Sequence, residues 1–196
     1  MPAYADSDLT IPLKIVISGG FGVGKTTFVG AVSEIQPLRT EETLTAAGIG
    51  TDDLTGIASK TATTVAMDFG RITLPLATYQ AMLLLFGTPG QDRFWFMWDS
   101  LSQGAVGAVV LADTRRLNDC FAAVEYFERC RMPFLVALNR FDGAYPYTVQ
   151  EVRAALGLAS HVPVIECDAR ENASARQVLI CLVQHARERA LLIPSV

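Results

Sequence analysis

The fold of this chain is decided by the stretch Leu13–Thr26, which reads LKIVISGGFGVGKT. It begins with an apolar run typical of a buried strand, Leu13–Ile17, and ends in the pattern Gly-x-x-x-x-Gly-Lys-[Ser/Thr] over Gly19–Thr26. A helical pattern follows over Thr27–Ile35. A loop with this pattern binds phosphate only where it joins the end of a strand to the start of a helix. Glycines let backbone N–H groups turn toward a polyphosphate, and the helix N-terminus adds partial positive charge. The stretch therefore predicts a nucleoside triphosphate site.

Two side chains of this loop have predicted roles of their own. Lys25 is expected to reach the β- and γ-phosphates, and Thr26 is expected to offer its hydroxyl to Mg²⁺. The whole predicted phosphate-binding set is Gly19, Gly20, Phe21, Gly22, Val23, Gly24, Lys25, Thr26 and Thr27.

The composition fits one domain of 196 residues with a substantial core. We expect a short tail over residues 1–10 and a single domain over residues 11–193. The hydrophobic content of 51% and the mean hydropathy of +0.31 suit a parallel sheet that is buried on both faces. The net charge of −4 and the pI near 5.2 argue against a nucleic-acid partner.

The cysteines and the termini bear on the cellular compartment. The four cysteines are widely spaced and form no Cys-x-x-Cys pair, so we expect reduced thiols rather than zinc ligands: Cys120, Cys130, Cys167 and Cys181. Pro2 stands where myristoylation needs glycine, and no apolar run approaches membrane-spanning length. The sequence predicts a cytoplasmic protein with no direct membrane anchor, which only a partner would recruit to a membrane.

Apolar, β-rich runs alternate with helical patterns along the chain, which is typical of a doubly wound α/β fold. We expect a mostly parallel six-stranded sheet with helices on both faces. The predicted strands are Leu13–Ser18, Thr64–Thr73, Ala81–Phe86, Gly107–Ala112, Pro133–Asn139 and Pro163–Cys167. The predicted helices are Thr26–Ile35, Phe94–Ser102, Leu117–Arg131, Val149–Leu156 and Ser174–Leu191. The long connection Gln36–Thr63 has weak periodicity and room for a mobile loop, an extra strand or a flap.

The base of the nucleotide is predicted from the segment Asn139-Arg140-Phe141-Asp142, which follows the apolar run Phe134–Leu138. A carboxylate at Asp142 accepts from guanine N1–H and from the 2-amino group, whereas adenine has a donor at neither position. A site built around such a bond discriminates by several orders of magnitude. Asn139 is expected to tie this loop to the phosphate-binding loop and to the guanine edge, and the stem of Arg140 is expected to cover one face of the base. The alternative is an Asn/Asp turn after a strand.

A second base-reading loop is predicted at the end of the last strand. Glu166-Cys167-Asp168-Ala169-Arg170 occupies the place where small GTPases carry Glu-Thr-Ser-Ala-Lys. The backbone N–H of Ala169 is expected to face guanine O6, with Asp168 and Arg170 beside it.

From Leu13 to Leu191 the chain resembles the Ras-like small GTPase superfamily. Phe86-Gly87-Thr88-Pro89-Gly90-Gln91-Asp92-Arg93-Phe94 is similar to the Rab/Ras stretch Trp-Asp-Thr-Ala-Gly-Gln-Glu-Arg-Phe, and Thr64–Phe69 to Thr-Ile-Gly-Val-Asp-Phe. The amino-acid sequence of both segments resembles that of the bacterial small GTPases encoded in actinomycete conservon operons. Those proteins are relatives of the myxobacterial gliding-polarity GTPases.

This resemblance implies GTP and GDP with Mg²⁺ as ligands. It implies that Thr64 contacts the metal and the γ-phosphate, that the Gly90 N–H contacts the γ-phosphate, and that Gln91 orients the attacking water. It also implies a roadblock-type regulator and a sensor-kinase-like membrane protein as partners.

The chain departs from the family pattern at two positions. Gly87 replaces the Asp that supports Mg²⁺, so we expect weaker metal coupling, with Asp68 or Asp92 near enough in sequence to substitute. Phe21 replaces a glycine beside the γ-phosphate, where its ring either crowds the site or covers the loop as a lid.

A cis arginine is not evident just before Thr64. Arg93 and Arg71 remain candidates for a catalytic arginine supplied by this chain. A partner could instead supply such an arginine in trans. The adjoining segment Phe94–Trp98 either packs inward or forms an aromatic docking patch.

Two functional readings follow. The first is a GTP-binding switch with slow hydrolysis that a partner regulates. The second is a non-hydrolysing scaffold that holds a guanine nucleotide as a fixed ligand.

Overall fold

The structure is a computed structural model that describes residues 9–44, 63–75, 79–90 and 96–191. Its seven strands form one sheet in the order β2-β3-β4-β1-β5-β6-β7. The pairs β1–β4, β1–β5, β5–β6 and β6–β7 are parallel. The pairs β2–β3 and β3–β4 are antiparallel. The strands are β1 (Thr10–Ser18), β2 (Leu38–Leu44), β3 (Thr63–Pro75), β4 (Gln80–Gly87), β5 (Ala105–Ala112), β6 (Phe134–Asn139) and β7 (Val164–Cys167).

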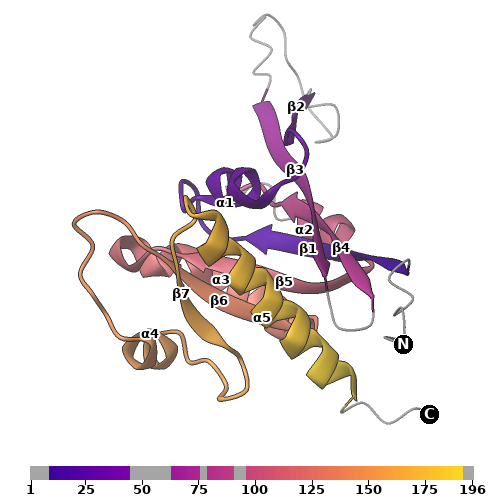
Figure 1. The fold of residues 1–196 in the computed structure, drawn as a ribbon. Helices are drawn as coiled ribbons and strands as arrows, with labels where there is room; N and C mark the ends of the chain where they lie inside the picture. Colours follow the sequence, from indigo (N-terminus) through magenta and orange to yellow (C-terminus); the bar gives the residue numbers. More distant parts are fainter. Residues whose placement is uncertain (1–8, 45–62, 76–78, 91–95, 192–196) are drawn as a thin grey trace, which may run out of the picture.

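Helices cover both faces of this sheet, and Figure 1 shows α1 and α5 together on the near face. The remaining helices lie behind the sheet or beside its β7 edge. Their bounds are α1 (Lys25–Val32), α2 (Phe96–Ser102), the 3₁₀ helix η2 (Thr114–Cys120), α3 (Phe121–Arg129), α4 (Val149–Ala155) and α5 (Asn172–Leu191).

Two hydrophobic cores follow from the alternation of side chains along the central strands. Ile15 and Ile17 face the core beneath α1 and α5, while Val16 between them faces the core beneath α3. Every residue of β6 is buried, as expected for a parallel strand covered on both faces. The predicted fold class is therefore confirmed.

The sheet has one strand more than the six predicted. The additional strand, β2, lies within the long connection after α1 and pairs with β3 from Leu38 opposite Phe69 to Leu44 opposite Thr63. Three of its seven residues are charged, so no apolar run marks it in the sequence. A strand at the edge of a sheet needs neither two buried faces nor two neighbours, and charged residues are common there.

The predicted helix Leu117–Arg131 is two helices. The 3₁₀ helix η2 precedes α3, and its backbone is non-helical at Arg116, where φ is −144° and ψ is 53°. This irregular segment directly follows β5 and contacts the loop between β1 and α1.

The predicted aromatic segment Phe94–Trp98 runs into α2, and within that helix Trp98 packs inward. Trp98 is 4% exposed and contacts Tyr126 edge-on, with the ring centroids 5.3 Å apart, and it stacks on Phe127. Phe94 and Trp95 lie outside the described residues.

Candidate nucleotide-binding site

The phosphate-binding loop lies where β1 ends and α1 begins, and its backbone requires glycine. Gly19 has φ +132°, and a Cβ there would lie 2.3 Å from the carbonyl oxygen of Leu111. Gly24 has φ +101°, and a Cβ there would lie 2.6 Å from Nδ2 of Asn139. L side chains rarely adopt such φ values, so these glycines let neighbouring strand ends approach the loop closely.

Lys25 lies over this loop, and its contact with phosphates stays a prediction. Its Nζ donates hydrogen bonds to the carbonyl oxygens of Gly19 (2.8 Å) and Gly20 (2.7 Å), and the side chain is 9% exposed. Burial lowers the pKa of Lys25 from 10.5 to about 8, and the nearby charge of Asp68 opposes that shift. Two backbone carbonyl oxygens hold the ammonium group over the loop, where it can meet an anionic ligand.

The structure places the carboxylate of Asp68 beside Gly87, while the other candidate, Asp92, lies outside the described residues. The hydroxyl of Thr26 donates to Asp68 Oδ2 at 2.5 Å. A Cβ on Gly87 would lie 3.1 Å from the Cβ of Asp68 and 3.4 Å from its Oδ2, so the Asp68 carboxylate occupies the space beside Gly87. The register that pairs Phe69 with Phe86 brings these two positions together.

This arrangement fits Mg²⁺ in combination with phosphate oxygens. Mg²⁺ is usually bound through one or two carboxylates together with water and substrate phosphates, not by a dedicated protein cage. In the described parts of the chain no group of three or more His, Cys, Asp or Glu side chains could hold a metal ion. Thr26 with Asp68 behind it would hold the metal, whereas the side chain of the other predicted ligand, Thr64, lies outside the described structure.

Gly90 lies against the phosphate-binding loop, where the sequence predicts it to contact the γ-phosphate. A Cβ there would lie 2.6 Å from Nζ of Lys25 and 2.9 Å from Cα of Phe21. Only glycine allows this approach. Gln91, the predicted water-orienting residue, lies outside the described residues, so its role stays a prediction.

Asn139 connects the two predicted base loops to the phosphate-binding loop. It is 7% exposed, its Nδ2 donates to the carbonyl oxygen of Val23 at 2.9 Å, and its Oδ1 accepts from the N–H of Ala169 at 2.9 Å. The bond to Val23 forms the predicted link to the phosphate-binding loop, and the predicted link of Asn139 to the guanine edge stays a prediction. The Ala169 N–H thus bonds to Asn139 in this structure, and its contact with a guanine O6 stays a prediction.

The charged residues of the base loops pair with one another. Arg140 pairs with Glu166, and Arg170 donates to both carboxylate oxygens of Asp168. These bonds from Arg170 hold the pKa of Asp168 at about 2. Asp142 differs, because its side chain is 97% exposed and its ion pair with Arg170 spans 3.9 Å. The carboxylate of Asp142 is therefore accessible, and its contact with a guanine base stays a prediction.

The segment after β5 adds residues that the sequence analysis missed. Asp113 is 3% exposed and binds Arg115 through Oδ1 and Oδ2, and Arg115 lies over the ring of Phe141 at 4.0 Å. The next residue, Arg116, donates from Nη2 to the carbonyl oxygen of Phe21 at 2.8 Å. The signal available in the sequence was Asp-Thr-Arg-Arg directly after a buried strand, at the sheet edge where ligands bind.

The structure also narrows the earlier alternatives for a cis arginine. In the sheet, Arg71 on β3 pairs with Leu84 on β4, and Leu84 pairs with Lys14 on β1. Lys14 precedes the phosphate-binding loop by about four residues, so Arg71 lies roughly 13 Å from that loop along the strand direction. Arg71 is therefore not the predicted donor, and Arg93 lies outside the described residues. Phe21 is 64% exposed in this structure, and its position relative to a γ-phosphate stays a prediction.

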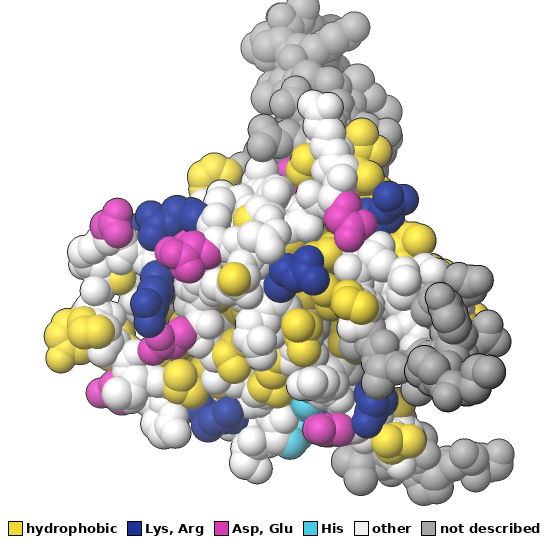
Figure 2. All heavy atoms as spheres, viewed as in Figure 1, with side chains coloured by type: hydrophobic (Ala, Val, Ile, Leu, Met, Phe, Trp, Pro, Cys, Tyr) yellow, Lys and Arg dark blue, Asp and Glu magenta, His cyan; other side chains and the backbone are white. Residues whose placement is uncertain are grey.

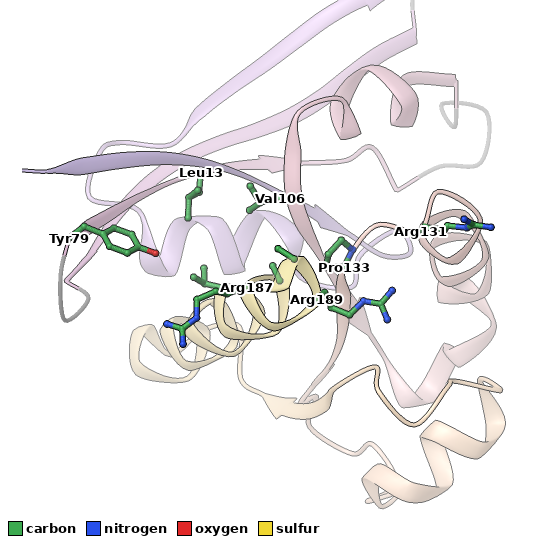
Figure 3. Close-up of a pocket in the computed structure, with 10 residues that line it drawn as sticks. Leu13, Tyr79, Val106, Arg131, Pro133, Arg187 and Arg189 are labelled. Carbon is green, nitrogen blue, oxygen red and sulfur yellow. The ribbon is translucent and has the colours of Figure 1, made fainter. Parts of the chain in front are cut away.

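A cavity of about 590 Å³ lies at the other end of the sheet, away from these loops. It runs between α5 and the early parts of β1 and β5, where Leu13, Val106 and Tyr79 line it (Figure 3). None of the predicted site residues belongs to it, and the nucleotide site rests on the loop geometry instead.

Positive and negative side chains are interspersed on the molecular face shown in Figure 2, without a broad basic patch among the residues described there. Within the described chain, none of the helices is both long enough and apolar enough to cross a membrane.

Fold and loop together define a P-loop nucleotide-binding protein. The chain belongs to the family described as "conserved hypothetical ATP binding protein", which it matches over residues 17–189. It is also similar to an uncharacterized protein of Methanocaldococcus jannaschii, with 26% identity over 132 residues that span 66% of this chain and 71% of that protein.

Proposed function

We propose that the protein is a guanine-nucleotide-dependent switch with slow GTP hydrolysis. The observation that carries the proposal is the bridge through Asn139, which joins the phosphate-binding loop at Val23 to the last-strand loop at Ala169. That bridge fixes the loop carrying Asp142, whose exposed carboxylate has the two acceptor oxygens that guanine's N1–H and 2-amino groups require.

ATP is the competing ligand, since the family description names it. Adenine has no donor at N1 or C2, so the carboxylate of Asp142, exposed in this structure, would lose water on binding ATP and gain no hydrogen bond from the base. Leaving a polar group unpaired once the base covers it costs about 1–3 kcal/mol, and more when it is charged. This cost favours the guanine nucleotide.

The switch itself would follow from contacts with the γ-phosphate. Gly90 lies against Lys25 and Phe21, which supports a contact between its N–H and the γ-phosphate. Together with Thr64 it would hold the two switch segments in the triphosphate state, and hydrolysis with Gln91 orienting water would release them. Thr26 and Asp68 would hold the Mg²⁺ ion, which screens charge on the phosphates.

A roadblock-type regulator that contacts these switch segments fits the resemblance to the conservon-type and gliding-polarity GTPases. In this proposal the protein is cytoplasmic and reaches a membrane only through a sensor-kinase-like partner. A change of affinity for the regulator between GTP and GDP would be its output.

The direct test is to identify the nucleotide that co-purifies with the protein and to measure single-turnover hydrolysis with and without the regulator. GDP or GTP in the purified protein and slow turnover support the switch. A bound guanine nucleotide that never turns over supports the scaffold alternative. Bound adenine nucleotide would contradict the guanine proposal.

A further inference from the structure

The 3₁₀ helix η2 places an arginine of this chain on the phosphate-binding loop. Arg116 Nη2 donates to the carbonyl oxygen of Phe21 at 2.8 Å, and a Cβ on Gly22 would lie 3.4 Å from the same nitrogen. On its other side Phe21 meets Gly90, whose Cβ position lies 2.9 Å from Phe21 Cα and 2.6 Å from Lys25 Nζ. The guanidinium therefore lies next to the residue that the γ-phosphate is expected to approach.

The backbone around Arg116 is fixed in this position. Its N–H donates to the carbonyl oxygen of Asp113 at 2.9 Å, and Asp113 is anchored through its side chain to Arg115. Asp119 packs against Gly20, where a Cβ would lie 2.5 Å from the Asp119 Cβ. The segment thus contacts the phosphate-binding loop at two successive residues.

The guanidinium itself is free to turn. Its side chain is 49% exposed, and its ion pair with Asp119 spans 3.7 Å. Among the described residues, the bond to Phe21 is the one side-chain hydrogen bond that Arg116 makes. Rotation about the side-chain torsions can exchange that acceptor for a phosphate oxygen, a stronger acceptor for a guanidinium.

We propose that Arg116 is the cis arginine of this protein and stabilises the charge that develops on the γ-phosphoryl group. The proposal rests on the guanine-nucleotide switch described above. In hydrolysis the bond from the β–γ bridging oxygen to the γ-phosphorus breaks, and a bond from water oxygen to that phosphorus forms. The proton of the water leaves to phosphate or solvent, and GDP and inorganic phosphate result. Arg116 keeps its proton throughout and contributes only charge and position.

The test compares the parent with Arg116→Gln, which keeps a donor for the Phe21 carbonyl but removes the charge, and with Arg116→Lys. Arg187→Gln is the matched control, because Arg187 lies on α5 beside the distant cavity. Each protein is assayed for GTP and GDP affinity, for single-turnover hydrolysis without partners, and for assembly of a GDP–aluminium fluoride complex.

We expect Arg116→Gln to lower the hydrolysis rate by about 10²-fold or more, given the 10³–10⁵ range for arginine fingers. Nucleotide affinity should change less than about threefold. The parent and Arg187→Gln should form the aluminium fluoride complex without a partner, and Arg116→Gln should not. Arg116→Lys should hydrolyse at an intermediate rate.

Three results would overturn the proposal for Arg116, of which two concern hydrolysis and the aluminium fluoride complex. One is equal hydrolysis by the parent and Arg116→Gln, and the other is a parent that forms no aluminium fluoride complex without a partner. Equal loss of GDP and GTP affinity in Arg116→Gln would also overturn it, since that pattern indicates support of the loop alone. If the parent binds no guanine nucleotide, the failure belongs to the proposed function instead.

Discussion

Replacing Asp68 by Asn should weaken Mg²⁺ binding while leaving metal-free nucleotide binding intact. Asp68 Oδ2 accepts from the Thr26 hydroxyl at 2.5 Å, within the range of charge-assisted O–H···O⁻ bonds. Hydrogen bonds to charged groups contribute about 1.5–3 kcal/mol. At 1.4 kcal/mol per factor of ten, that corresponds to roughly a 10- to 150-fold loss of Mg²⁺ affinity.

The assay is titration of Mg²⁺ into the protein loaded with a fluorescent guanine nucleotide, with a parallel measurement in EDTA. In EDTA the affinity of Asp68→Asn should be equal or higher, because a negative charge beside the phosphates has been removed. Glu125→Gln, an exposed change on α3, is the matched control. An unchanged Mg²⁺ titration, or equal losses with and without metal, would refute the role assigned to Asp68.

A swapped pair sharpens this test. A Cβ on Gly87 would lie 3.1 Å from the Asp68 Cβ, so Gly87→Asp alone is crowded. In the double variant Asp68→Gly/Gly87→Asp the crowding disappears and a carboxylate stands at the position usual for small GTPases. Mg²⁺ affinity within about tenfold of the parent is expected, a difference of at most about 1.4 kcal/mol.

Three further predictions concern the loops and the core. Asn139→Ala removes the bonds to Val23 and Ala169, and leaving buried groups unpaired costs about 1–3 kcal/mol each, so urea unfolding should show a loss of at least about 2 kcal/mol; an unchanged midpoint would contradict the tether. Phe21→Gly should keep nucleotide affinity and preserve or raise turnover, whereas Gln91→Leu should lower it; single-turnover rates decide, and equal rates for Gln91→Leu and the parent would exclude Gln91. Burial raises the pKa of Cys120 to about 12 and that of Cys167 to about 11, so at pH 8 both hold little thiolate. A maleimide should therefore label exposed Cys130 first, as mass spectrometry would show, and equal labelling of Cys120 would contradict its burial.

Short stretches of sequence were enough to predict the phosphate-binding loop and the central strands. The loop pattern depends on a few consecutive residues, and the buried parallel strands read as apolar runs because helices cover both their faces. The tether through Asn139 was also predictable, since its loop directly follows the end of β6.

Features that depend on long-range register escaped the sequence analysis. Asp68 could be named as a substitute for the missing Asp, but its place beside Gly87 depends on the antiparallel pairing of β3 with β4. The edge strand β2 carries no apolar run. The position of Arg116 follows from one non-helical residue in η2, which no periodicity reveals.

Base selection is tested most directly by measuring the affinities of the parent and of Asp142→Asn for GTP, XTP and ATP, with Lys25→Ala as the non-binding control. The parent should prefer GTP over ATP. Asp142→Asn should bind GTP at least about tenfold more weakly, a loss of about 1.4 kcal/mol or more, and should shift its preference toward XTP. Unchanged selectivity in Asp142→Asn, or a parent that binds ATP as tightly as GTP, would contradict a guanine-specific site.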